Sequence, residues 1–254
     1  MELEFFDSNM YIGRISNAQT YKPALTGSDL VKAMDHMGIG KALVWHIAQF
    51  DYSVPEGNNL LSSLIKENDR LFGCWSILPP QTGEIPFVDE MFSRMKNERV
   101  FALRPFPGEH KYLLNRTVFG DFLDEVSKRK IPLMLSMQKL EMDYKYIYEI
   151  MSEYPDLTCI LCDVGIWGQD RRVRPLVEKY DNLYVETSCL SIHDGVVEDF
   201  VNKYGPDRLV FGSAFPEKIP EASMLQLMHA EISDDAKRKI ACENLEKMIG
   251  EVVL

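Results

Sequence analysis

Apolar, β-branched runs alternate with amphipathic stretches along the whole chain. The runs at residues 41–45 and 158–162 are almost continuously apolar, which is typical of strands covered on both faces. The pattern predicts eight strands, at residues 3–10, 41–48, 71–78, 100–106, 132–137, 158–164, 182–188 and 208–214. It predicts helices between them and after the last strand, at residues 28–38, 58–68, 86–98, 117–130, 144–155, 170–180, 194–204, 219–230 and 233–249.

Strand–helix alternation of this kind builds a parallel sheet with crossover helices, and eight such units close into a barrel. The structural alternative is an open doubly wound sheet. It usually carries a glycine-rich turn after its first strand, and residues 5–9 lead into no such turn. The sequence therefore predicts an α/β fold, a single (β/α)₈ barrel over residues 1–254.

Two local signals refine this picture. Ser233 is predicted to cap the last helix, with Asp234 and Asp235 at its positive end and Gly250 near its other end. The longest irregular stretch, residues 13–26, directly follows the first strand. In a barrel this loop lies at the catalytic face, so we expect it to form a lid or one wall of a pocket.

The composition and charge of the chain limit the kinds of partner that it can bind. Hydrophobic residues make up 46% of the 254 residues, enough to bury a core, and the net charge of −11 argues against nucleic-acid and anionic-membrane partners. The first residues do not resemble a signal peptide, and no stretch has the apolar length of a membrane span. Five scattered cysteines suit reduced thiols. We therefore expect a cytoplasmic protein whose partner is a small molecule.

In a (β/α)₈ barrel the chemistry lies at the carboxyl ends of the strands. The polar and aromatic residues expected there are Asp7, Asn9, Tyr11, Arg14, His46, Gln49, Trp75, Arg104, Ser136, Gln138, Asp163, Trp167, Glu186, Thr187, Ser188, Ser213 and Glu217. Side chains alternate along a strand, which predicts one shared face for Asp7, Asn9 and Tyr11, and another for Ser136 and Gln138.

Glu186 is expected to point into the mouth of the barrel, because an outward carboxylate would be trapped against helices. There it could meet Arg104 or Arg14. By contrast, Cys159 and Cys162 are three positions apart on a strand and face opposite sides, so they make a poor metal or redox pair.

Three segments resemble the amidohydrolase-related proteins. Residues 5–13, Phe-Phe-Asp-Ser-Asn-Met-Tyr-Ile-Gly, resemble the Asp-x-His-x-His-x-Gly opening of that family. Residues 207–216 are similar to its eighth-strand segment, and residues 240–250 resemble its closing helix with an asparagine, here Asn244, and a final glycine. The resemblance spans essentially the whole chain. It implies a barrel that hydrolyses or decarboxylates small carboxylated, lactone or amide compounds, and it leaves a homodimer open.

The same resemblance shows where this chain departs from the family. The family's metal ligands are four histidines and an aspartate, and this chain has at those places Asn9, Tyr11, Ser136, Asp163 and Ala214. Zinc prefers imidazole, thiolate or carboxylate ligands, and only Asp163 offers one. We therefore expect no metal and no other cofactor, with a Mg²⁺ or Ca²⁺ site on Asp7, Asn9 and Asp163 as the alternative. Some branches of the family are lactonases thought to need no metal.

The expected roles follow from side-chain chemistry. Asp163 is the first choice for proton transfer, with Glu186 and His46 as second choices. A purely structural alternative exists for two of these residues. Asp163 would form a salt bridge with Arg104 or Arg14, and His46, a lone histidine on a strand, would be a hydrogen-bonded core residue.

Substrate binding is assigned by the same reasoning. Arg104 and Arg14 would bind the negative charge of the substrate. The remaining substrate-binding candidates are Asn9, Tyr11, Ser136, Gln138 and Trp167. Asn9 and Tyr11 would polarise a carbonyl group, or would simply fill the volume of the absent histidines.

Two functions remain open. The first is a metal-independent or degenerate hydrolase of the lactonase type, and the second is a non-catalytic barrel that binds a small polar ligand or a protein. An enzyme needs an accessible Asp163 with a perturbed pKa, whereas a relic site can leave Asp163 locked in a salt bridge.

Overall fold

Eight parallel strands lie side by side in chain order in the computed structural model, which describes residues 3–16, 19–86, 88–140, 144–165 and 170–254. The strands are β1 (Phe6–Ile12), β2 (Lys41–His46), β3 (Leu71–Ile77), β4 (Val100–Pro105), β5 (Leu133–Ser136), β6 (Cys159–Cys162), β7 (Leu183–Glu186) and β8 (Leu209–Val210). The amides of Ser8 and Tyr11 donate to the carbonyls of Phe211 (2.9 Å) and Phe215 (3.0 Å), which joins the first strand to the last. The predicted (β/α)₈ barrel is confirmed.

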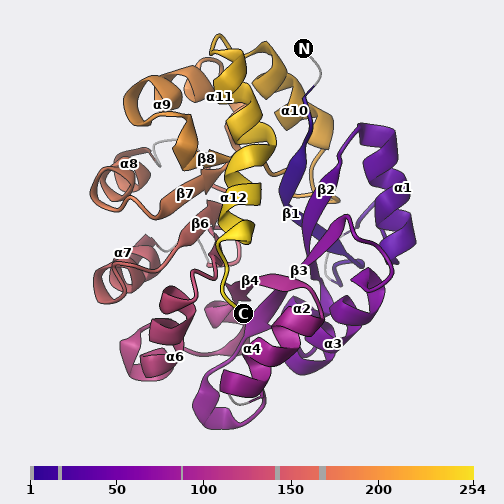
Figure 1. Cartoon of the computed structure of the whole chain (residues 1–254), viewed down its shortest axis with the longest axis vertical. Coiled ribbons are helices and arrows are strands. Elements are labelled where there is room, and N and C mark those ends of the chain that lie inside the picture. The colour runs from indigo at the N-terminus through magenta and orange to yellow at the C-terminus, as the bar shows by residue number, and fades with distance from the viewer. Residues whose placement is uncertain (1–2, 17–18, 87, 141–143, 166–169) are drawn as a thin grey trace.

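Helices surround the strands on the outside (Figure 1). They are α1 (Gly27–Met37), α3 (Val54–Ile65), α4 (Val88–Asn97), α6 (Arg116–Lys128), α7 (Tyr144–Glu153), α8 (Asp170–Lys179), α9 (Val196–Tyr204) and α10 (Pro220–His229). The helices α2 (Ala48–Asp51) and α5 (Pro107–His110) were not predicted, because four residues are too few for an amphipathic pattern. Within the described ranges, no helix is long and apolar enough to cross a membrane.

The predicted helix at residues 233–249 is three segments. They are α11 (Asp234–Arg238), a π-helical turn (Lys239–Glu243) and α12 (Asn244–Gly250). The Ser233 side chain accepts from the amide of Ala236 (3.2 Å), which confirms the predicted cap. The Asn244 side chain donates to the carbonyls of Pro206 (2.9 Å) and Leu209 (2.8 Å), so it fastens the last helix to β8.

Apolar side chains form two layers, one between strands and helices and one inside the barrel. Cys159 lies in the outer layer and Cys162 in the inner one, as strand alternation predicts. The inner layer includes Phe6 near the start of β1, together with side chains of the last helix: Cys242, Leu245, Met248 and Ile249. Figure 1 shows α12 crossing the barrel, which it closes at the amino ends of the strands.

The strand β1 does not keep a regular register. Its pairing with β2 shifts between Asp7 and Met10. As a result Phe6 and Tyr11 both lie in the inner layer although they are five positions apart. The predicted shared face of Asp7, Asn9 and Tyr11 is therefore wrong for Asp7, whose neighbour Phe6 already points inward.

Candidate functional site

Five polar side chains from five different strand ends meet at the mouth of the barrel. Asn9 comes from β1, Arg104 from β4, Asp163 from directly after β6, Glu186 from the end of β7 and Lys218 from the loop after β8. These five residues are called the mouth cluster below. Charged groups are rarely buried without a partner, so the contacts of each one define what the cluster can do.

Asp163 is held on both of its oxygens. The Lys218 ammonium donates to Oδ1 (3.0 Å) and the Ser136 hydroxyl donates to Oδ2 (2.5 Å). Burial opposes the ionisation of Asp163, but Lys218 and Ser136 outweigh it and hold the pKa below its ordinary value. The expected salt bridge of Asp163 exists, but its partner is Lys218 and not Arg104 or Arg14.

Glu186 is completely buried and accepts several hydrogen bonds. The Ser188 hydroxyl (2.8 Å), the Asp163 amide (3.3 Å) and the Asn9 side chain (3.5 Å) donate to Oε2, and the Ser188 amide donates to Oε1. Burial and the nearby charge of Asp163 raise the pKa of Glu186 to about 7. The prediction that Glu186 points into the mouth is confirmed, but the predicted pairing with Arg104 or Arg14 is wrong, because Ser188 and Asn9 occupy its oxygens.

Arg104 lies deep in the barrel and contacts neutral groups. It donates to Asn9 Oδ1 (2.8 Å) and lies over the Trp45 ring at 4.9 Å from the centroid. It forms no ion pair with an acid among the described residues. The Asn9 side chain thus bridges Arg104 to Glu186, so the arginine reaches this acid only through the amide.

Lys218 is the member of the mouth cluster that sequence reasoning missed. Besides Asp163, its ammonium donates to Ser188 Oγ (3.1 Å) and Cys189 Sγ (2.8 Å). Burial disfavours its charge, but Asp163 and Glu186 outweigh burial and raise its pKa above the ordinary value. A signal was present, because a lysine two residues after Pro216 lies on the loop that leaves the carboxyl end of a barrel strand.

Several predicted site residues lie elsewhere. Arg14 and Gln138 are exposed, and the shared face of Ser136 and Gln138 is wrong because β5 ends at Ser136 and a turn follows. His46 is buried away from the mouth cluster, where its Nδ1 accepts from the Ala48 amide (3.0 Å) and burial lowers its pKa. Trp167 lies outside the described residues.

Tyr11 belongs to an aromatic wall of the mouth. Its ring is 4.9 Å from that of Trp45, which in turn lies 5.5 Å from Phe106. Burial and the charge of Glu217 raise the pKa of Tyr11, so its hydroxyl stays protonated at neutral pH. Tyr11 is 2% exposed and does not line the large pocket, so its position favours filling volume over contacting a ligand.

A pocket of about 920 Å³ opens beside the mouth cluster. It is lined from the β1–α1 loop, from α1, from Lys139 and from the loop after β8, which contributes Phe215, Glu217 and Lys218. Lys139 pairs with Glu217 (3.3 Å) at its edge. The expectation that residues 13–26 form one wall of a pocket is confirmed for the described part of that loop.

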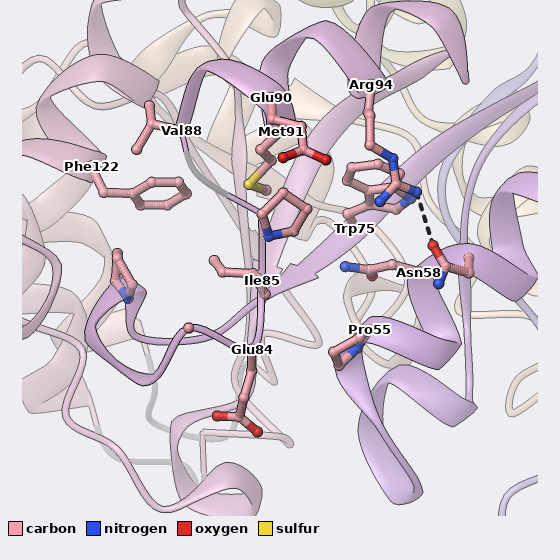
Figure 2. Close-up of a pocket in the computed structure, with 14 residues that line it drawn as sticks. Pro55, Asn58, Trp75, Glu84, Ile85, Val88, Glu90, Met91, Arg94 and Phe122 are labelled. Atoms are coloured by element: carbon pink, nitrogen blue, oxygen red, sulfur yellow. Dashed lines mark hydrogen bonds between the residues drawn. The ribbon is translucent and has the colours of Figure 1, made fainter.

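A second, smaller pocket of about 380 Å³ lies between α3 and α4 under the loop after β3 (Figure 2). Trp75 is part of its wall and not of the mouth, because its side chain points into the helix layer. The Arg94 guanidinium lies 4.9 Å from the Trp75 ring and is already bound by Glu98 (2.9 Å) and Asn59 (2.9 Å). This pocket contains no member of the mouth cluster, so it is not the site described here.

Metal-ligand geometry is found elsewhere in the described ranges. The one group of three acid or thiol ligands that these residues bring together is Glu4, Cys242 and Glu246, at the opposite end of the barrel. Lys41 already pairs with both of its acids. The three residues of the alternative Mg²⁺ or Ca²⁺ site already have protein partners. Asp7 Oδ1 accepts from the amides of Asn9 (2.9 Å) and Ser213 (3.1 Å), the Asn9 oxygen accepts from Arg104, and the oxygens of Asp163 accept from Lys218 and Ser136.

Comparisons with known proteins agree with the barrel. A family model described as amidohydrolase matches residues 29–250. A search of curated proteins finds no match. A 2,6-dihydroxybenzoate decarboxylase from Rhizobium superposes with a TM-score of 0.76 at 13% identity, covering 98% of this chain and 99% of that one.

Two further solved structures have the same fold. A 5-carboxyvanillate decarboxylase from Sphingomonas paucimobilis has a TM-score of 0.71 at 10% identity, with 99% and 100% of the two chains covered. A dihydroxybenzoic acid decarboxylase from Polaromonas sp. JS666, described with bound manganese and the inhibitor 2-nitroresorcinol, has a TM-score of 0.74 at 13% identity, with 98% and 97% covered.

Proposed function

The chain belongs to the amidohydrolase family, and from this premise we propose that its barrel mouth binds and converts a small carboxylated compound without a metal ion. The solved neighbours named above act on small carboxylated aromatic compounds, which supports this class of substrate. Lactone or amide hydrolysis and decarboxylation are the reactions that we consider, because both need one proton transfer at the reacting centre.

The observation that carries the proposal is the position of Lys218. Its side chain is 25% exposed and lines the large pocket, while its ammonium rests on the buried Asp163. Its three N–H groups already donate to Asp163, Ser188 and Cys189, so a ligand carboxylate would be attracted by the lysine's positive charge and would displace one of the two neutral acceptors, Ser188 or Cys189. Lys218 takes over the role that the sequence suggested for Arg14 and Arg104.

Glu186 is the proposed proton-transfer group. Its pKa of about 7 suits proton exchange near neutral pH, whereas the lowered pKa of Asp163 does not. A hydrogen-bonded path leads from Glu186 Oε2 through the Ser188 hydroxyl (2.8 Å) to the Lys218 ammonium (3.1 Å). A proton could thus move between a buried acid and the pocket surface.

The donor set of the mouth fits a divalent ion poorly. Both oxygens of Asp163 accept from Lys218 and Ser136, and the Asn9 oxygen accepts from Arg104. A divalent ion would need these oxygens and would lie beside two cations, which repel it. We therefore route no step through a metal.

One observation favours a second function, a barrel that binds the same ligand without converting it. Asp163 is only 6% exposed and locked in its ion pair, as expected of a relic site. Ligand binding and turnover must therefore be measured separately.

The test uses protein treated with EDTA and the probes 2,6-dihydroxybenzoate, 5-carboxyvanillate and a set of small lactones. We expect at least one probe to raise the melting temperature, and Lys218→Met to weaken its binding about tenfold or more. Lys203→Met is the matched control, because Lys203 is also ion-paired, to Asp199 on α9, outside the pocket.

Turnover of the bound probe is then followed by chromatography. Glu186→Gln should lower kcat about a hundredfold or more and leave probe affinity nearly unchanged. Binding without any turnover by the wild-type protein would favour the non-catalytic function, and failure of every probe to bind would refute the proposal.

A further inference from the structure

The Lys218 ammonium is surrounded by protein acceptors, much as a bound metal ion is surrounded by its ligands. It has three N–H groups and three protein acceptors, on Asp163 (3.0 Å), Ser188 (3.1 Å) and Cys189 (2.8 Å). Two of these acceptors follow β7 and one follows β6, so a lysine from the loop after β8 ties three successive strand ends together. A surface lysine, by contrast, is a mobile chain with water around its charge.

Charge balance in the mouth cluster depends on this lysine. Asp163 and Glu186 are both buried, and buried carboxylates need a compensating cation. Arg104 makes no direct contact with either acid within the described ranges, because Asn9 stands between it and Glu186. Lys218 is therefore the cation in direct contact with Asp163, and it reaches Glu186 through the Ser188 hydroxyl.

We propose that Lys218 is the resident cation of the barrel mouth, and that it closes the mouth to a divalent metal ion. This inference rests on the site of the proposed function. The inference predicts what removal of the ammonium would leave. Asp163, Ser188 and Cys189 would surround an empty position, and the charge of the Asp163 carboxylate would have no direct partner. Carboxylate and hydroxyl oxygens are ligands for Mn²⁺, so the variant should accept the ion that the wild-type protein rejects.

The test measures metal binding and not turnover, so its failure is distinguishable from failure of the proposed function. EDTA-treated wild-type, Lys218→Met and Lys139→Met proteins are titrated with Mn²⁺ and followed by thermal unfolding and by the electron paramagnetic resonance signal of free Mn²⁺. Lys139 is the matched control because it also lines the pocket and pairs with an acid, Glu217.

We expect Mn²⁺ to raise the melting temperature of Lys218→Met by about 5 °C at a large excess over Kd, with one equivalent bound. The wild-type and Lys139→Met proteins should not respond, and Lys218→Met/Asp163→Asn should lose the response. The proposal is overturned if Mn²⁺ stabilises all the proteins alike, or if Lys218→Met binds no ion.

Lys218→Met could fail to fold, since it leaves a buried charge without a partner. In that case Lys218→Met/Asp163→Asn should recover soluble protein because both charges are removed together, and Lys218→Arg should fold and ignore Mn²⁺. One equivalent of Mn²⁺ bound by the wild-type protein and lost in Asp163→Asn would refute the proposal whatever Lys218→Met does.

Discussion

The two ends of this barrel are filled in opposite ways. At the amino ends of the strands, Phe6 packs against Leu245, Met248 and Ile249 of the last helix. At the carboxyl ends, the mouth cluster buries two acids and an arginine and holds a partly exposed lysine against one of the acids. Apolar burial stabilises a fold, whereas buried charge costs stability unless every group is paired. The chain therefore concentrates stability at one end and keeps its ionisable chemistry at the other.

The largest expected effect on stability comes from a substitution in the apolar end of the barrel. Leu245 is 1% exposed, so Leu245→Ala removes packed methyl groups and leaves a cavity. We expect the free energy of unfolding to fall by about 4 kcal/mol, measured by urea denaturation. Ligand affinity at the mouth should stay nearly the same, because the substitution lies at the other end of the barrel.

Val253→Ala is the control for that experiment, since Val253 is 59% exposed in the same terminal segment and should change stability little. Equal losses of stability and ligand affinity in Leu245→Ala would show that the two ends are coupled, contrary to the comparison above.

The next effect concerns the charged end and depends on pH. Because the pKa of Glu186 is raised from 4.5 to about 7, the native state holds a proton that the unfolded chain has released. The contribution of Glu186 to the free energy of unfolding is thus fully present below pH 4.5. It is lost as pH rises through about 7, by on the order of 3 kcal/mol. Glu186→Gln lacks this titration and should show a flatter profile of unfolding free energy against pH.

The difference between the wild-type and Glu186→Gln profiles reports the titration of Glu186 alone. Burial also raises the pKa of Asp7, to about 6, but Asp7 is present in both proteins and cancels in the difference. Urea denaturation at intervals from about pH 4 to pH 8 measures both profiles. Parallel profiles would mean that Glu186 has an ordinary pKa in the folded protein, and its proposed role in proton transfer would then lose its basis.

The apolar half of this comparison could be predicted from sequence more fully than the charged half. Strands buried on both faces leave a periodic pattern that extends over many residues, so all eight were found. The break in the last helix was not, because Lys239–Glu243 changes from α to π geometry within a continuous amphipathic pattern.

The mouth depends on single residues at strand ends, where alternation stops. The turn after Ser136 exposes Gln138 and brings Lys139 to the pocket. The pairing of Asp163 with Lys218 joins residues 55 positions apart, and no local pattern encodes such a contact. The sequence pattern therefore identified both acids, which lie at strand ends, but not Lys218, which lies on the loop after β8.

The smallest expected effect concerns backbone strain at the mouth. Ala214 adopts a left-handed conformation (φ 55°), and its carbonyl accepts from the amides of Glu217 (3.0 Å) and Lys218 (3.2 Å). This strained turn therefore directs Lys218 toward Asp163. Ala214→Gly relieves the strain but adds freedom to the unfolded chain, so we expect a net gain of about 0.5 kcal/mol in unfolding free energy.

Lys130→Gly is the matched change at the opposite end, because Lys130 is also left-handed (φ 53°) and follows a helix before β5. It should bring a smaller gain in unfolding free energy, measured by urea denaturation, because it also removes the exposed ion pair of Lys130 with Glu251. Isothermal titration then separates the two variants. Ala214→Gly should weaken ligand binding severalfold, since a glycine lets the turn that positions Lys218 relax, and Lys130→Gly should not. If both variants bind alike, the Ala214 turn does not hold Lys218 in place, and the ion pair with Asp163 alone positions the lysine.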